Sequence, residues 1–171
     1  MAGRRTEALA GAVLLTVPLA GCQAGSMGTI GITRTTDGAL AAVVARCTST
    51  LARLEVRHGP QDDAARRTVD LTLEAFRPSQ DAVVVVPLSA ETSGWHRSPT
   101  VFTPAGGERY YVVGTDRARG WNTGEVTFVV DDLPELGPDQ VLVSSLAGEP
   151  VAEEVVTEVV SLERFRKDAC T

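Results

Sequence analysis

Few side chains in this chain of 171 residues have the types and spacing that catalysis requires. His58 and His96 are its 2 histidines, the side chains that titrate near neutral pH. Ser93 lies three residues before His96, but no Gly-x-Ser-x-Gly turn presents a nucleophile to a base. We therefore interpret this spacing as a chance pairing in a serine-rich loop, and His58 as a surface residue among charges. The chain is not expected to be an enzyme.

Two pairs of adjacent carboxylates are the other candidates for chemistry. Asp131-Asp132 and Glu153-Glu154 could serve glycoside hydrolysis or calcium binding. We interpret them instead as solvated residues of a turn and of a strand edge. A structural metal site would need more ligands than the cysteines and histidines supply. No metal and no cofactor are therefore expected.

Cys22 follows a segment that is typical of an export signal. Arg4 and Arg5 precede an apolar run over residues 8–19, which at roughly a dozen residues is too short to cross a bilayer core of about 30 Å. The run ends in the sequence LAGC at residues 19–22, which resembles the lipobox of bacterial prolipoproteins: an aliphatic residue, two small residues and a cysteine. The resemblance implies cleavage before Cys22 and a fatty-acyl anchor on its thiol, at the extracytoplasmic face of the cell membrane.

Three parts of the chain are therefore expected: a signal peptide at 1–21, a flexible tether at 22–28 and a single domain at 29–171. The whole chain carries a net charge of −6, and the signal carries +2 from its arginines and −1 from Glu7, so the mature charge is −6 − (+1) = −7. An acidic chain is a poor match for nucleic acid. The expected partners are the membrane, through lipid on Cys22, and an exported protein or the cell wall.

Cys47 and Cys170 form an even pair once Cys22 carries lipid. Outside the cytoplasm such a pair usually forms a disulfide. The bond would close a loop of 170 − 47 = 123 residues. On the chain-entropy model a loop of this length stabilises the fold by about 4–5 kcal/mol. A metal site and two free thiols are the alternatives.

Alternation of apolar and polar residues along short segments is the dominant pattern of the mature chain. It continues from Ile30 to Val160, with turn signals such as Asp37-Gly38 between the segments. The pattern predicts a mainly β domain: an antiparallel, immunoglobulin-like β-sandwich of about seven or eight strands. A short C-terminal helix is expected after Ser161, which would cap it. A small β-barrel is the alternative.

Four finer expectations concern single segments. Residues 82–86 are apolar at every position, which predicts a central strand. Residues 89–107 are expected to form a long loop, and Asp131 to cap a helical turn. The turn at 136–141 is similar to the corner before the sixth strand of immunoglobulin-like domains, but Val141 stands where that corner has tyrosine.

The layout also resembles a group of small actinobacterial lipoproteins. The shared features, after the lipobox, are the Thr36-Asp37-Gly38 turn, Cys47 at the end of a strand, the sequence GPDQVLV at 137–143, and the segment from Val160 to Cys170. The resemblance spans most of the chain. It implies membrane anchoring and no particular chemistry.

An unusual concentration of aromatic residues lies in the middle of the chain. Both tryptophans, both tyrosines and one histidine fall within 121 − 95 + 1 = 27 positions; these are Trp95, His96, Tyr110, Tyr111 and Trp121. They could form a binding surface at one end of the sandwich, or each ring could cover the core, which is the interpretation that we favour.

These observations predict a membrane-anchored extracytoplasmic lipoprotein whose domain is a non-catalytic interaction module. The alternative is a surface enzyme or a solute-binding component with an unrecognised site. A deep pocket that joined Trp95, His96, Trp121 and a carboxylate would indicate the alternative.

Overall fold

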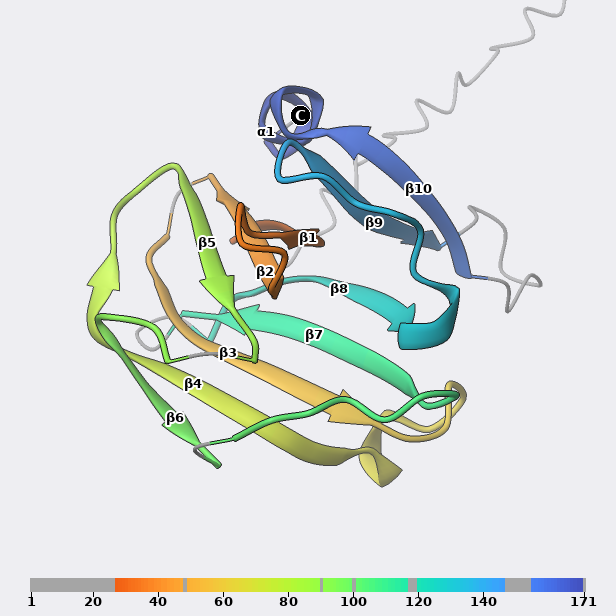
Figure 1. The fold of residues 1–171 in the computed structure, drawn as a ribbon. Helices are drawn as coiled ribbons and strands as arrows, with labels where there is room; N and C mark the ends of the chain where they lie inside the picture. Colours follow the sequence, from red (N-terminus) through yellow and green to blue (C-terminus); the bar gives the residue numbers. More distant parts are fainter. Residues whose placement is uncertain are drawn as a thin grey trace, which may run out of the picture.

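The computed structural model describes residues 27–47, 49–89, 91–99, 101–116, 120–146 and 155–170. These residues form ten strands, two short 3-10 turns and one α-helix near the C-terminus (Figure 1). The predicted mainly β class is confirmed, although the strands number ten rather than seven or eight. No helix in these ranges is long and apolar enough to span a membrane. Cys22, the predicted lipidation site, lies outside the described residues.

Two antiparallel sheets of five strands pack against each other. The first sheet has the order β10 (Val155–Ser161), β9 (Gln140–Leu146), β1 (Gly28–Arg34), β2 (Leu40–Arg46) and β5 (Val83–Pro87). The second has the order β6 (Trp95–Ser98), β4 (Thr68–Ser79), β3 (Leu51–His58), β7 (Arg109–Thr115) and β8 (Asn122–Val129). The two sheets do not close into a barrel, so the fold is a sandwich.

A side chain links β8, the edge strand of the second sheet, to β9 of the first sheet. The hydroxyl of Ser144 accepts a hydrogen bond from the backbone N–H of Thr127 at 2.9 Å and donates to its carbonyl at 3.2 Å. Among the described residues, no ladder of backbone hydrogen bonds joins β8 to β9, and this side chain links the two strands instead.

The connectivity of the strands is immunoglobulin-like. In such domains strands A, B and E lie in one sheet and strands C, F and G in the other. Here β1, β2 and β5 are neighbours in the first sheet, while β3, β7 and β8 are neighbours in the second. The β9–β10 hairpin extends the first sheet beyond β1, and β4 with β6 extends the second beyond β3. These additions account for the strands beyond the expected number.

The β1–β2 hairpin forms at the predicted turn. Gly38 has φ +85°, a left-handed conformation that favours glycine, and its N–H donates to the carbonyl of Thr35 at 2.8 Å. The hydroxyl of Thr35 donates to Asp37 and so holds the pKa of this carboxyl below its ordinary value. The turn between β1 and β2 therefore forms at Asp37-Gly38, where the sequence predicts it.

The main core lies between the sheets and is built from the inward-facing residues of both. Its fully buried members include Ile32, Leu54, Val56, Leu71 and Leu73. A second apolar cluster lies on the outer face of the first sheet, where α1 (Leu162–Asp168) covers it; it consists of Val43, Ala45, Val141, Val160 and Phe165.

Strand β2 is therefore buried on both faces. It occupies the interior position in the sheet that was predicted for residues 82–86. Strand β5, which contains residues 83–86, is the edge strand of the first sheet. Val84 and Val86 face the core, but Val85 is 43% exposed. The prediction of a central strand at 82–86 is wrong because α1 covers β2 and leaves the outer face of β5 uncovered.

Two smaller predictions are also corrected. The segment 89–107, expected to be a loop, contains the four-residue strand β6, which pairs with β4. The turn η2 (Val130–Asp132) forms, but Asp131 lies inside it and Val129 precedes it without a side-chain capping bond. Ser161 does cap α1 as predicted, because its hydroxyl accepts from the N–H of Arg164 at 3.2 Å.

A tyrosine corner is present, but in a different place from the one expected. Tyr110 lies at the start of β7, the counterpart of strand F, and its hydroxyl accepts a hydrogen bond from the N–H of Ala105 at 2.8 Å. This is the arrangement that characterises the corner before strand F in immunoglobulin-like domains. The comparison of Val141 with that tyrosine was therefore wrong, because β9 is an added strand.

The folded domain begins earlier than position 29. Met27 is fully buried, its N–H donates to the carbonyl of Asn122 at 3.1 Å, and its carbonyl accepts from Cys47 at 3.0 Å. Gly28 is the first residue of β1, and a Cβ there would lie 2.0 Å from the carbonyl oxygen of Ala45. Both residues were assigned to the tether and belong to the sandwich instead.

Candidate functional site

The five residues predicted as a binding surface do not share one surface in the structure. Tyr110 faces the main core and is 4% exposed, whereas Tyr111 faces the opposite side of the sheet and is 1% exposed. Alternation along β7 sends consecutive side chains to opposite faces. Neither tyrosine is therefore available to a partner, although His96 is exposed on β6.

The two tryptophans lie at opposite edges of the second sheet. Trp95 begins β6, Trp121 precedes β8, and β4, β3 and β7 lie between them. Four strand spacings of about 4.8 Å separate them by roughly 19 Å. Both rings are partly buried against the main core. The two tryptophans therefore share no common surface, and each ring covers the core separately, which is the arrangement that we favoured from the sequence over a binding surface.

Removal of either tryptophan side chain should lower the stability of the fold, whereas removal of the His96 side chain should not. Because each ring is only partly buried, Trp95→Ala and Trp121→Ala should each lower the free energy of unfolding by about 1–2 kcal/mol, less than the 3–5 kcal/mol of a fully buried aromatic. Urea denaturation followed by circular dichroism measures the loss. His96→Ala is the matched control and should change stability by less than about 0.5 kcal/mol. Losses no larger than this control in both tryptophan variants would contradict the assignment.

Arg67 covers Tyr111 on the outer face of the second sheet. Its guanidinium carbon lies 3.5 Å from the centroid of the Tyr111 ring, and Nη1 donates to both carboxylate oxygens of Glu125 at 2.8 Å. Nε and Nη2 donate to the carbonyls of Pro60 and Gln61 at 3.2 and 3.1 Å. The side chain of Arg67 is only 7% exposed. Stacking and charge-assisted hydrogen bonds thus fasten the β3–β4 loop to this face.

A second charged group follows β3 on the same face. Glu55 is 8% exposed and lies between Arg53, at 2.5 Å, and the Nε of Arg57, at 2.9 Å. Arg53 also reaches Glu74 of β4 at 3.8 Å. A buried carboxylate is tolerated only when it is paired in this way. The outer face is therefore a set of matched charges rather than an unpaired basic or acidic patch.

His58 is held by a carboxylate, which the sequence did not indicate. Its Nδ1 lies 2.6 Å from Oδ2 of Asp70, the geometry of the base and the orienting acid in a catalytic triad. Within the described ranges no serine, threonine or cysteine side chain forms a hydrogen bond with His58. The same ranges contain no group of three or more His, Cys, Asp or Glu residues that could hold a metal ion.

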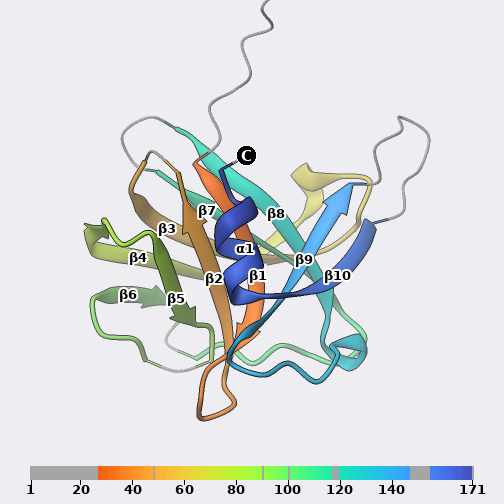
Figure 2. The same cartoon turned by 90° about the horizontal axis from the view of Figure 1, so that it is seen from above.

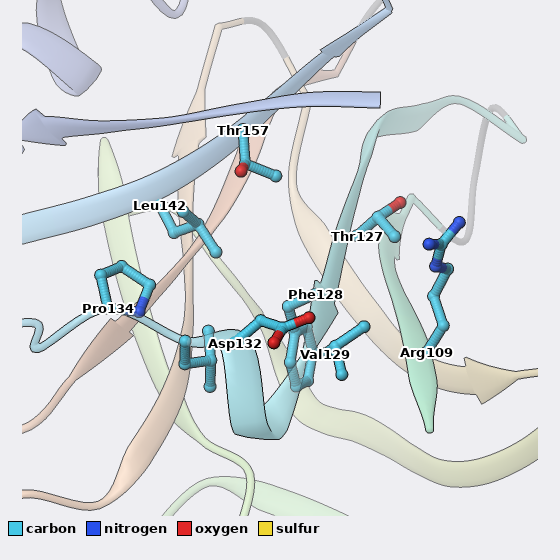
Figure 3. Close-up of a pocket in the computed structure, with 9 residues that line it drawn as sticks. Arg109, Thr127, Phe128, Val129, Asp132, Pro134, Leu142 and Thr157 are labelled. Carbon is cyan, nitrogen blue, oxygen red and sulfur yellow. The ribbon is translucent and has the colours of Figure 1, made fainter. Parts of the chain in front are cut away.

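A hollow of about 220 Å³ lies between β8, η2, β9 and β10 (Figure 3). Thr127 and Thr157 line it from β8 and β10, Leu142 contributes an apolar wall from β9, and Arg109 and Asp132 add one charge of each sign. None of Trp95, His96 and Trp121 lines this hollow. It therefore does not have the composition that would have indicated the enzyme or solute-binding alternative.

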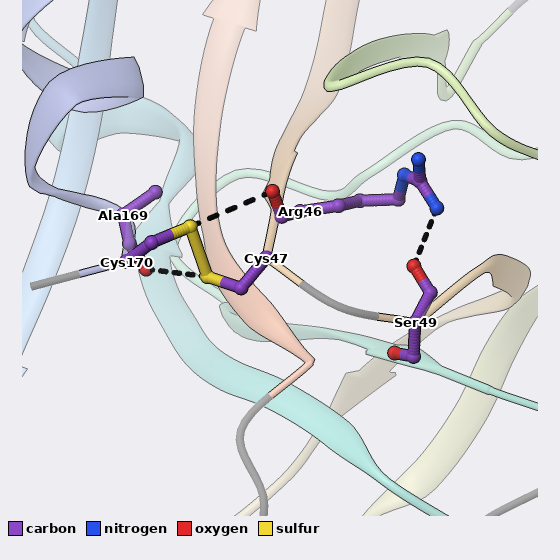
Figure 4. Close-up of a disulfide and its surroundings, with 5 residues drawn as sticks. All are labelled: Arg46, Cys47, Ser49, Ala169 and Cys170. Atoms are coloured by element: carbon purple, nitrogen blue, oxygen red, sulfur yellow. Dashed lines mark hydrogen bonds between the residues drawn. A yellow bond between two sulfur atoms is a disulfide. The ribbon is translucent and has the colours of Figure 1, made fainter.

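Cys47 and Cys170 form a disulfide with their Cα atoms 5.5 Å apart, within the limit expected for such a bond (Figure 4). The bond fixes Cys170, two residues after α1, to Cys47, the residue that follows β2. Beside it, the guanidinium of Arg46 donates to the backbone carbonyls of Ser49, Gln80 and Asp81, the last at 2.6 Å. Covalent and polar links therefore converge at this end of the sandwich.

The fold and these arrangements define an immunoglobulin-like β-sandwich that carries an added hairpin and a disulfide-fastened C-terminal helix. Comparison of the chain with protein-family models, with curated proteins and with solved structures gave no match. The sequence did not reveal the Arg67–Tyr111–Glu125 group, because its members are far apart in the chain and each is unremarkable by itself.

Proposed function

We propose that the protein is a bacterial lipoprotein, anchored by lipid on Cys22 at the outer face of the cell membrane. The observation that carries this proposal is the LAGC sequence directly after the apolar run, at residues 19–22. The disulfide between Cys47 and Cys170 supports it, since such bonds persist in compartments outside the cytoplasm. The charged outer face of the domain is compatible with an aqueous environment beside the membrane.

We further propose that the sandwich is a non-catalytic interaction module for an exported protein or a cell-wall component. Its exposed loops lie on a rigid framework, the usual arrangement of binding modules of this shape. Among the described residues, His58 pairs with the carboxylate of Asp70, and the hollow at η2 carries one charge of each sign.

Substitution of the lipidation residue tests the anchor. Cys22→Ser should abolish incorporation of labelled palmitate and should leave the protein unprocessed, because serine has no thiol to accept the diacylglyceryl group. Radiolabelling in the native host, with flotation of membranes, measures both effects. Cys170→Ser is the matched control, since it removes a cysteine but leaves the anchor. Equal labelling of Cys22→Ser and wild type would refute the proposal.

A further inference from the structure

Both ends of the described domain lie at the same end of the sandwich, which we call the tether end. It is formed by Met27, Arg46, the Cys47–Cys170 disulfide and Asn122. Figure 2 shows the C-terminus beside the start of β1, while the β1–β2 turn projects from the opposite end. This opposite end, which we call the far end, contains the Asp37-Gly38 turn, η2 and the start of β9.

The tether between the proposed lipid and the domain is very short. Cys22 and Met27 are five steps apart along the chain (27 − 22 = 5). At no more than about 3.6 Å per residue they span at most about 18 Å. Met27 cannot readily extend this reach, because its side chain is fully buried and both of its backbone polar groups are bonded within the sandwich.

The far end lies too far from Met27 to reach the bilayer as easily as the tether end does. Strand β1 runs for seven residues from Gly28 to Arg34 before the turn begins. At about 3.4 Å per residue, the turn lies roughly 20 Å or more from the point where the tether enters the domain. Strand β8 covers a similar length between Asn122 and η2. A lipid on Cys22 therefore holds the tether end close to the membrane surface and leaves the far end free.

Charge favours the same orientation. At the far end, acidic side chains of the β1–β2 turn, of η2 and of the segment before β9 outnumber the basic Arg34 and Arg109; they are Asp37, Asp131, Asp132, Glu135 and Asp139. At the tether end, basic and acidic side chains balance among the described residues: Arg46, Arg166 and Lys167 against Asp81, Asp116 and Asp168. Anionic headgroups repel an acidic surface. The end that the tether holds near the membrane is thus also the end that approaches headgroups at lower electrostatic cost.

We infer that the tether end of the sandwich faces the lipid headgroups and that the acid-rich far end points away from the membrane. The inference rests on the proposed lipid anchor at Cys22. It assigns one surface of the domain to the bilayer that holds the anchor, and it removes that surface from the places where an exported partner binds.

Energy transfer to a labelled bilayer tests this orientation. The lipidated full-length protein is placed in vesicles of phosphatidylcholine and phosphatidylglycerol that contain an acceptor dye on their headgroups. A donor dye is attached through a clickable residue at Gln80, at the tether end, or at Thr36, at the far end; both positions are exposed. Because roughly 20 Å separates the two ends, transfer from Gln80 should exceed transfer from Thr36 by about twofold or more. Equal or greater transfer from Thr36 would overturn the inference.

A lengthened tether is the control for the reach argument. Insertion of about twenty glycine and serine residues between Gly25 and Ser26 should reduce transfer from Gln80, because the linker then allows the domain to leave the surface. Unchanged transfer from Gln80 in this variant would contradict the role of the short tether. Flotation separates the two proposals: a protein that does not float with the vesicles refutes the lipid anchor, whereas a floating protein with the wrong transfer ratio refutes only the orientation.

Discussion

Tyr110→Ala is expected to lower the free energy of unfolding by about 3–5 kcal/mol, the usual cost of removing a buried aromatic ring. The ring of Tyr110 is 4% exposed and lies at the centre of an aromatic group. Its centroid is 5.5 Å from that of Phe128 in a stacked arrangement and 5.8 Å from that of Phe102 in an edge arrangement. Alanine would leave a cavity at the point where both sheets and the corner before β7 meet. Urea denaturation followed by circular dichroism measures the loss.

Phenylalanine variants of the two adjacent tyrosines separate the ring from the hydroxyl. Tyr110→Phe keeps the ring but removes the acceptor for the N–H of Ala105, so a loss of about 1 kcal/mol is expected. Tyr111→Phe is the matched control, because the buried hydroxyl of Tyr111 has no hydrogen-bond partner among the described residues. Its removal should leave stability unchanged or slightly raised. A larger loss for Tyr111→Phe than for Tyr110→Phe would show that the corner bond does not stabilise the fold.

Loss of the disulfide should have an effect of similar size. The double variant Cys47→Ser/Cys170→Ser is expected to lose about 2–5 kcal/mol of unfolding free energy, because the bond closes a long loop in the unfolded chain. In the folded state the bond also holds α1 on the outer face of β2, where Phe165 packs with Val43 and Val160. Thermal denaturation measures the global loss, and hydrogen exchange should show faster opening of α1 than in wild type.

Cys22→Ser is the control for this second prediction, since it removes a cysteine without affecting the bond. The sandwich domain of that variant should melt at the wild-type temperature, although its signal segment is not removed. The prediction fails if the double variant melts with wild type, or if native protein taken from the cell surface carries Cys47 and Cys170 as free thiols.

The sequence predicted the strands of the fold better than their positions in the sheets. Alternation tells which residues of a strand share a face, but it does not tell what covers that face. Residues 82–86 were therefore assigned to the centre of a sheet, although β5 lies at its edge. The strand that is buried on both faces is β2, because α1, which lies near the C-terminus, packs on its outer face. Strand β6 was missed because its four residues lie in a segment rich in serine, glycine and proline.

The candidate site was harder to predict because proximity in sequence does not imply proximity in space. Tyr110 and Tyr111 are adjacent but face opposite sides of the sheet, while Trp95 and Trp121 belong to opposite edges. Conversely, Arg67 and Glu125 form an ion pair across 58 positions that no local pattern connects. The disulfide was predictable because only two cysteines remain after Cys22 is assigned to lipid, so their pairing needs no knowledge of the fold.

The disulfide also determines which proteolytic cuts can release material from the domain. A single cleavage of the backbone anywhere between Cys47 and Cys170 leaves both fragments covalently joined, since the bond links the residues on either side of the cut. The connections between β3 and β10 can therefore be nicked without shedding a fragment. Among the described residues, only those before Cys47 lie outside the loop that the disulfide closes. In this N-terminal segment the β1–β2 turn at Asp37-Gly38 is exposed. A single cut there would leave β1 attached to the rest of the sandwich by non-covalent contacts alone.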